Sequence, residues 1–298
     1  MRKIAGRIGK HVRVLGSAVS AVRGNIAKSA AILEKSRFTD RENFRALRNI
    51  LRIQGRDRTI IDRFYTAINL IADCKPEAEP VINNLLSVSE GQLCQDILAV
   101  LAFEQKKAGT FVEIGVGSGK SISNTYLLET KFGWNGLLIE PCRTFHDSIA
   151  KQRKAKLDRR AASSVEDTEL EFFETKGNGE FSYASNAKAE GGKSPSDKEF
   201  TFYKVQTATL NRIFAEHKMP KNIDFISLDT EGSEVDILKG LDLTRHRIGL
   251  FCIEHNDRPG FVKALDSILI PHGYRRIMPV TSAYDAWYVH ASLHSSYL

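Results

Sequence analysis

The residues best suited to chemistry begin with three spaced glycines that follow a short apolar run. The run Phe111–Ile114 contains an acid, Glu113, and leads directly into Gly115, Gly117 and Gly119. Glycine permits a tight turn and lets the backbone approach a ligand closely. A helix starting near Lys120 would point its free N–H groups at that ligand. Taken alone, this pattern suits a dinucleotide, a nucleoside or a phosphate.

Two further apolar runs also end in acids. Glu140 follows the run Gly136–Ile139 and lies 21 residues beyond Gly119. An acid at this place can accept hydrogen bonds from both hydroxyls of a ribose. The run Ile223–Leu228 leads into a third acidic segment, which contains Asp229, Glu231 and Glu234. Because ligands of open α/β sheets bind at the carboxyl ends of strands, three strands that end in acids predict one shared site.

The charge beside the glycines favours one cofactor over its rivals. Glu113 would repel a diphosphate, but it suits the α-amino group and the sulfonium of S-adenosylmethionine. A phosphate-binding loop ending at Gly119-Lys120-Ser121, with Asp229 as its magnesium ligand, would need a glycine where the chain has Ile114. A nicotinamide dehydrogenase could use Glu140 on its ribose, but Glu113 opposes the pyrophosphate. We therefore predict S-adenosylmethionine, with Glu113 at its methionine part.

Methyl transfer needs an acceptor oxygen in line with the sulfonium methyl, and often a base. Asp229 and Glu231 are predicted to orient the acceptor or the cofactor; capping of the following helix is the alternative. His255 follows the run Ile248–Ile253 on the same predicted edge and could take the acceptor proton, or could simply pack there. Asp229, Glu231 and His255 could together hold magnesium, but no tight ligand motif supports this, so we predict no metal.

After Thr110 the chain alternates short apolar runs with helical stretches, which indicates a mostly parallel sheet with both faces covered. The remaining apolar runs are Arg275–Pro279 and Ala286–Val289. Residues 175–199 are rich in Gly, Ser, Lys and Asn, and they separate two further predicted strands, 169–173 and 200–205. We expect this segment to be a long loop, either a lid over the acceptor or disordered.

The N-terminal segment carries the positive charge of the chain. Residues 1–75 hold 17 Lys/Arg against 6 Asp/Glu, so the net charge of +7 divides into +11 here and −4 in the remaining 223 residues. Apolar residues recur every three or four positions in residues 4–26, as in a basic amphipathic helix. Residues 1–33 could therefore lie on an anionic membrane surface, pack on the body of the protein, or contact a second subunit.

The chain divides, on this reading, into a mainly helical extension over residues 1–88 and a cofactor-binding domain over residues 89–298. Its four cysteines are scattered, with no C-x-x-C pair, and no run of about 18 uncharged apolar residues occurs. We expect a cytoplasmic protein that could contact a membrane peripherally through residues 1–33, and we expect no specific nucleic-acid partner.

Several of these segments resemble FkbM-type methyltransferases. Residues 223–234 followed by Val235–Gly240 are similar to the signature of that family, and its cofactor half is similar to Phe111–Gly115, Ser123–Thr125 and Gly136–Pro141. The resemblance implies a Rossmann-like class I methyltransferase fold, with a mostly parallel seven-stranded sheet, a reversed last strand and helices on both faces. It also implies methyl transfer from S-adenosylmethionine, usually to a hydroxyl of a sugar, a glycan or a secondary metabolite.

The resemblance assigns two further residues to the cofactor. Asn124 falls in the matching Ser123–Thr125 segment. Many relatives of this fold hold the adenine amine with an acid after the third strand, and that place here reads Arg160-Ala161-Ala162-Ser163-Ser164. Adenine is then expected on backbone near Ala162 or on a neighbouring hydroxyl. The alternative function is a catalytically silent Rossmann-like binding or scaffold protein that docks through its basic N-terminal segment.

Overall fold

The computed structural model describes residues 58–175, 183–184 and 200–298. The predicted amphipathic segment 1–33, and most of the predicted loop 175–199, lie outside these ranges, so the expectations for both stay predictions. Among the described residues, no helix has the length and apolar character needed to cross a bilayer.

Seven strands form the main sheet, in the order β10-β11-β9-β8-β1-β2-β3. Five of them are parallel neighbours: β1 (Thr110–Ile114), β2 (Asn135–Ile139), β3 (Lys156–Asp158), β8 (Asn222–Leu228) and β9 (Arg247–Glu254). The last strand, β11 (Asp285–His290), runs antiparallel between β9 and β10 (Tyr274–Ile277). This arrangement confirms the predicted mostly parallel sheet with a reversed last strand.

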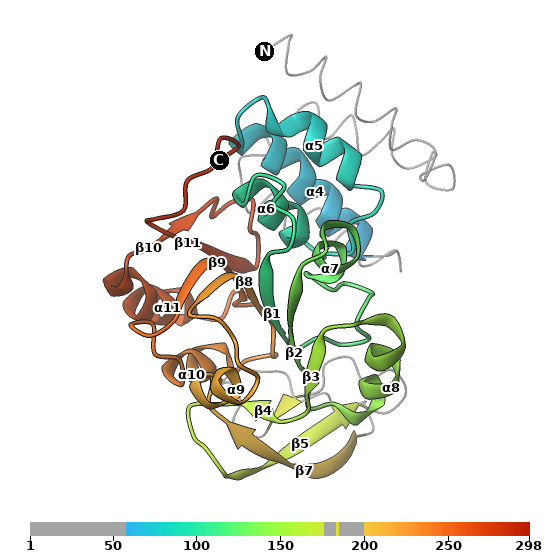
Figure 1. The fold of residues 1–298 in the computed structure, drawn as a ribbon, viewed down its shortest axis with the longest axis vertical. Coiled ribbons are helices and arrows are strands. Elements are labelled where there is room, and N and C mark those ends of the chain that lie inside the picture. Colours follow the sequence, from blue (N-terminus) through green and yellow to red (C-terminus); the bar gives the residue numbers. More distant parts are fainter. Residues whose placement is uncertain (1–57, 176–182, 185–199) are drawn as a thin grey trace.

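Alternate side chains of each strand point to opposite faces of the sheet, because a strand has a two-residue repeat. In β1, Phe111 belongs to one hydrophobic cluster and Val112 to the other. The first cluster includes residues from α4 (Arg58–Asp73), α5 (Ala78–Leu85), α6 (Gln95–Ala102), α7 (Tyr126–Phe132) and α8 (Arg143–Gln152). The second includes residues from α9 (Leu210–Glu216), α10 (Glu234–Lys239) and α11 (Phe261–Leu269), which the short η3 (Ile270–His272) follows. Helices therefore cover both faces, as predicted (Figure 1).

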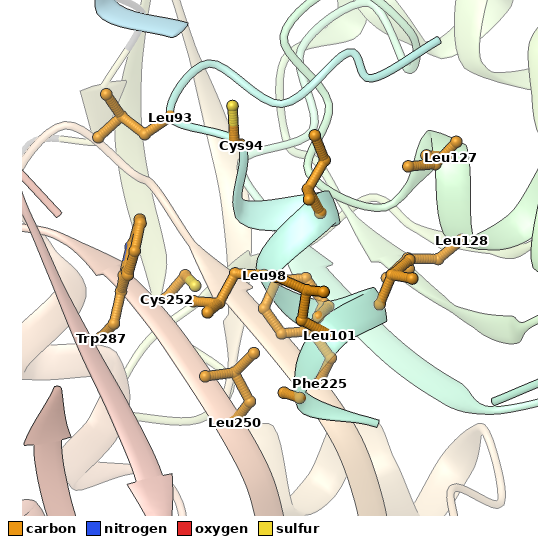
Figure 2. Close-up of a cluster of buried hydrophobic side chains, with 14 of the residues drawn as sticks. Leu93, Cys94, Leu98, Leu101, Leu127, Leu128, Phe225, Leu250, Cys252 and Trp287 are labelled. Atoms are coloured by element: carbon orange, nitrogen blue, oxygen red, sulfur yellow. The ribbon is translucent and has the colours of Figure 1, made fainter. Parts of the chain in front are cut away.

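Helix α6 is the centre of the first cluster, and every one of its residues is buried. Figure 2 shows Leu98 and Leu101 of this helix among Phe225, Leu250 and Trp287 of the sheet. Helices α4 and α5 belong to the same cluster. The predicted boundary between residues 88 and 89 stays a prediction, although the helices on its N-terminal side pack directly on the sheet domain.

A second, smaller sheet lies beyond β3, at the opposite end of the molecule from α4 and α5 (Figure 1). Its order is β4-β7-β5-β6, with β4 (Ala161–Ala162), β5 (Glu169–Thr175), β6 (Tyr183–Ala184) and β7 (Phe200–Ala208). Strands β5 and β7 confirm the two predicted strands that flank residues 175–199. Within that segment, residues Tyr183–Ala184 form β6 and pair with β5.

Candidate functional site

The glycine turn after β1 is built directly against the acidic loop after β8. Gly115 has a φ of 78°, and a Cβ added there would lie 1.7 Å from the carbonyl oxygen of Asp229. The backbone N–H of Asp229 in turn donates to the carbonyl of Ile114 at 3.0 Å. Only glycine fits position 115, because both the positive φ and the close backbone contact exclude a side chain. Two of the predicted site segments therefore meet at one edge of the sheet.

Glu140 holds the glycine turn from the neighbouring strand. Its Oε2 accepts hydrogen bonds from the N–H groups of Val116 and Gly117 at 2.8 and 2.9 Å, and its Oε1 accepts from the N–H of Cys142 at 2.8 Å. Burial raises the pKa of Glu140 to about 7. A Cβ added to Gly117 would meet no atom within 4 Å, so the space beside this turn is open. Ribose binding by Glu140 stays a prediction; the structure shows that the same carboxylate also shapes the turn.

Glu113 is held by several contacts within the chain. The residue is 2% exposed, and its carboxylate accepts from the N–H of Asn124 at 2.7 Å and from the Ser123 hydroxyl at 2.9 Å. The guanidinium of Arg153, whose side chain is completely buried, lies 3.2 Å away. Through these contacts Glu113 connects the loop that follows the glycines to β1. Its contact with the methionine part of the cofactor stays a prediction.

Arg153 is a site residue that the sequence analysis missed. It follows α8, and it donates to the carbonyl of Gly119 at 3.2 Å and pairs with Glu129 of α7 at 2.7 Å. One buried guanidinium thus joins β1, the glycine turn and α7. No local pattern marks this residue, because its partners lie 24 to 40 positions away in the sequence.

Arg153→Met is expected to lower the free energy of unfolding by about 3–5 kcal/mol, because it leaves the buried carboxylates of Glu113 and Glu129 without their cation. Urea unfolding followed by circular dichroism measures this change. Lys151→Met, at an exposed position near the end of the same helix, is the matched control and should change stability by less than about 0.5 kcal/mol. Equal effects of the two substitutions would show that the pairing of Arg153 with Glu113 and Glu129 contributes little to the free energy of unfolding.

The predicted helix near Lys120 begins only at Tyr126. The intervening residues form a polar loop whose donors bond to Glu113, so they do not continue into helical hydrogen bonds. Asn124 lies in this loop, and its Nδ2 donates to the hydroxyl of Ser227 at 2.8 Å, which ties the loop to β8. Its Oδ1 is buried and has no hydrogen-bond partner among the described residues. Cofactor binding by Asn124 stays a prediction.

The acidic loop after β8 has a constrained backbone. Glu231 has a φ of 59°, in the left-handed region that non-glycine residues rarely adopt. The fully buried Glu234 holds this shape, since its Oε1 accepts from the N–H groups of Thr230 and Gly232 at 2.8 and 3.0 Å. Its Oε2 lies 3.4 Å from the guanidinium of Arg258. Strained residues of this kind are concentrated at functional sites, where the surrounding structure maintains them.

Three carboxylates converge at this point: Asp229, Glu231 and Glu254 offer oxygens that all lie within 4.8 Å of one another. Burial, followed by the charge of Glu231, raises the pKa of Asp229 well above its ordinary value. Burial, followed by the charge of Asp229, does the same for the pKa of Glu254. The buried Asp285, whose strand pairs with β9 opposite Glu254, adds a fourth acid nearby, and burial raises its pKa to about 6.

Glu254, the last residue of β9, was not predicted as a site residue, because the sequence does not show that β9 pairs with β8 and brings this acid beside Asp229. The neighbouring His255, which was predicted as a base, is buried, and both of its ring nitrogens are used within the chain. Its Nδ1 accepts from the N–H of Asp257 at 3.0 Å, so its Nε2 carries the hydrogen and donates to the carbonyl of Asp285 at 3.1 Å. Both ring nitrogens therefore have partners within the chain, and the role of His255 as a catalytic base stays a prediction.

An acid, Asp158, lies just before the segment 160–164 that was predicted to contact adenine. Strand β3 ends in Asp158, which binds Arg160 at 2.6 Å and His217 at 3.0 Å. This acid could not be predicted from the sequence, because a three-residue strand has no recognisable pattern. Ala162 is buried in β4, where it pairs with Ala208 of β7. Its contact with adenine stays a prediction.

Comparisons with known proteins give one family and several distant matches among solved structures. The chain resembles a precorrin-6y C5,15-methyltransferase from Geobacter metallireducens GS-15, with 13% identity over 61% of this chain and 70% of that one, and a TM-score of 0.33. A mutant of MtNAS matches with 11% identity over 78% of this chain and 74% of that one, also with a TM-score of 0.33. None of the curated proteins compared matches the sequence. A model of the FkbM methyltransferase domain matches residues 113–276, which is more than half of the chain, and the chain therefore belongs to this family.

Proposed function

We propose that this methyltransferase uses S-adenosylmethionine to methylate a hydroxyl oxygen on a sugar, a glycan or a secondary metabolite. The observation that carries the proposal is the contact of the glycine turn with the acidic loop at Gly115 and Asp229. This contact brings the cofactor half and the acidic half of the family signature to one edge of the sheet. Ligands of open α/β sheets bind at such an edge.

The cofactor fits beside the glycine turn. Gly117 borders open space, and Glu140 lies directly behind it, where its carboxylate can accept hydrogen bonds from the two ribose hydroxyls. Bound S-adenosylmethionine supplies an electrophilic methyl group on a positively charged sulfur.

The acidic loop is the side from which the acceptor would approach. Asp229 and Glu231 can accept a hydrogen bond from the acceptor hydroxyl and hold its oxygen in line with the methyl group. In the transfer, the new O–C bond forms while the S–C bond breaks and its electron pair stays on sulfur. The hydroxyl proton leaves to a carboxylate or to water. A raised pKa, as at Asp229, is what suits a carboxylate to accept a proton near neutral pH.

A methyl-transfer assay tests this proposal. The chain is incubated with ¹³C-methyl S-adenosylmethionine and a panel of amine-free sugars, glycans and hydroxylated metabolites. We expect carbon NMR of the product to show an O-methyl ether. Transfer only to nitrogen or carbon in a wider panel would contradict the proposed acceptor class, and no transfer to any compound would count against the enzyme function.

Glu140→Gln is expected to weaken S-adenosylmethionine binding by about 10-fold at pH 7.5, because a neutral amide is a poorer acceptor for two hydroxyls than a carboxylate. The raised pKa of Glu140 adds a pH dependence. Below pH 7 the wild-type carboxyl becomes protonated, so cofactor affinity should fall as the pH decreases from about 7.5 to 6. Calorimetric titrations across this range measure both effects.

The Gln variant is also the control for that pH dependence. The amino group of the cofactor titrates identically with both proteins. The ratio of the dissociation constants of the variant and the wild type therefore isolates the effect of Glu140 ionisation on cofactor affinity. We expect this ratio to shrink towards one as the pH falls through 7. A ratio of one at every pH would remove Glu140 from the ribose site.

A further inference from the structure

The convergence of Asp229, Glu231 and Glu254 raises the question of what balances their charge. Two of the three side chains come from the carboxyl ends of adjacent parallel strands: Asp229 follows β8, and Glu254 ends β9. The third comes from the loop that Glu234 holds in its constrained shape. Neither Asp229 nor Glu254 has a Lys or Arg partner within the described part of the chain, since Arg258 pairs with Glu234. The carboxyl groups of Asp229 and Glu254 hydrogen-bond to each other.

A buried oxygen of Glu254 provides a second and separate observation. The residue is 8% exposed, and its Oε2 has no hydrogen-bond partner among the residues that the structure describes. A buried carboxylate oxygen without a partner is costly, because it has lost its water and gained nothing in return. Buried charges in proteins are normally paired or coordinate a metal.

We infer that Asp229, Glu231 and Glu254 bind a divalent cation of the magnesium class. Carboxylate oxygens are the ligands that Mg²⁺ and Ca²⁺ prefer, at metal–oxygen distances of about 2.0–2.6 Å. Oxygens on one such ion lie up to roughly 4–5 Å apart, which agrees with the 4.8 Å within which the three ligand atoms lie. The sequence had suggested Asp229, Glu231 and His255 as possible ligands of magnesium. In the structure, Glu254 and not His255 lies with the other two carboxylates.

Three carboxylates leave part of the coordination sphere of Mg²⁺ open, because this ion takes six ligands and keeps several waters. An acceptor hydroxyl can replace one of these waters. The cation then lowers the pKa of that hydroxyl and holds its oxygen at the edge of the sheet where the glycine turn lies. The proton leaves to solvent before or during formation of the O–C bond. This role for the cation rests on the proposed methyl transfer, whereas cation binding itself does not.

Binding of Mn²⁺ to the full chain, freed of metals with a chelator, tests the site without any turnover. Free Mn²⁺ gives a sharp electron paramagnetic resonance signal that disappears on binding. We expect one Mn²⁺ per chain, displaced by excess Mg²⁺, and a dissociation constant at least about 10-fold weaker in Glu254→Gln. Glu169→Gln removes an exposed acid on β5 and should leave binding unchanged.

Circular dichroism checks that the variants are folded. If Glu254→Gln does not fold, Glu231→Gln, on a half-exposed loop residue, is measured in its place with the same expectation. Absence of saturable Mn²⁺ binding in the wild type would overturn the site and would leave a shared proton between Asp229 and Glu254 to balance their charge. Binding that survives both substitutions would place the ion elsewhere and would equally overturn the site.

Titration of the same protein with S-adenosylmethionine separates this inference from the proposed function. Cofactor binding without Mn²⁺ binding would leave the methyltransferase proposal standing and remove the cation site. Mn²⁺ binding without cofactor binding would support the cation site and count against the methyltransferase proposal. Competition between the two ligands would show that the cofactor's own positive charge occupies the carboxylates, which contradicts the metal site. We expect each ligand to bind in the presence of the other.

Discussion

Gly115→Ala is expected to lower the free energy of unfolding by more than about 3 kcal/mol and to abolish S-adenosylmethionine binding. The added Cβ would lie 1.7 Å from the carbonyl oxygen of Asp229, a backbone atom that cannot move without shifting β8. The φ of 78° at this position adds further strain for any L side chain. Urea unfolding and calorimetry on the same preparation measure the two losses.

Gly117→Ala is the matched control for that variant. Gly117 also has a positive φ, of 57°, but a Cβ added there meets no atom within 4 Å. Only the conformational cost of about 1–2 kcal/mol is expected, and the variant should remain folded. Its affinity for the cofactor should still fall, because the methyl group enters the space beside the turn. Equal stability of the two variants would show that the close contact between Gly115 and Asp229 does not exist in solution.

Asp229→Asn is expected to reduce turnover by about 100-fold or more while changing S-adenosylmethionine affinity by less than about 3-fold. The substitution keeps the size of the side chain but removes the negative charge that orients the acceptor. Steady-state rates with an acceptor methylated by the wild-type chain, together with calorimetry, separate the two parameters.

Asp147→Asn, on the exposed side of α8, is the control for the loss of one negative charge and should leave turnover unchanged. Two results would remove Asp229 from the acceptor side of the site. One is unchanged turnover of Asp229→Asn. The other is a loss of cofactor affinity as large as the loss of turnover, which would place this carboxylate on the cofactor.

Four of the five parallel strands could be predicted because each contains a short, mainly apolar run. β1, β2, β8 and β9 all lie where such runs occur, and their ends bring the predicted acids to one edge of the sheet. Strand β3 could not be predicted, since Lys156-Leu157-Asp158 is too short to show a period. The acid at its end, Asp158, was missed for the same reason.

The roles of individual acids depend on contacts that a sequence does not contain. Glu113 could be predicted as a residue at the end of a strand beside the glycine turn. Its partner Arg153 lies 40 residues later in the sequence and contacts it only because α8 packs against this part of the sheet. Glu254 joins Asp229 only because β9 pairs with β8, whereas His255, one residue on, is turned into hydrogen bonds with its own loop. Sequence spacing could therefore locate the edge of the site but could not decide which acid faces its centre.

Calorimetric titration of the full chain with S-adenosylmethionine tests the central claim most directly, with S-adenosylhomocysteine, ATP and NAD titrated in parallel. The account predicts saturable binding of the two sulfur nucleosides and none of ATP or NAD. Binding of ATP or NAD in their place would contradict the reading of the glycine turn between Gly115 and Gly119. Absence of binding by all four would contradict a cofactor site at this edge of the sheet.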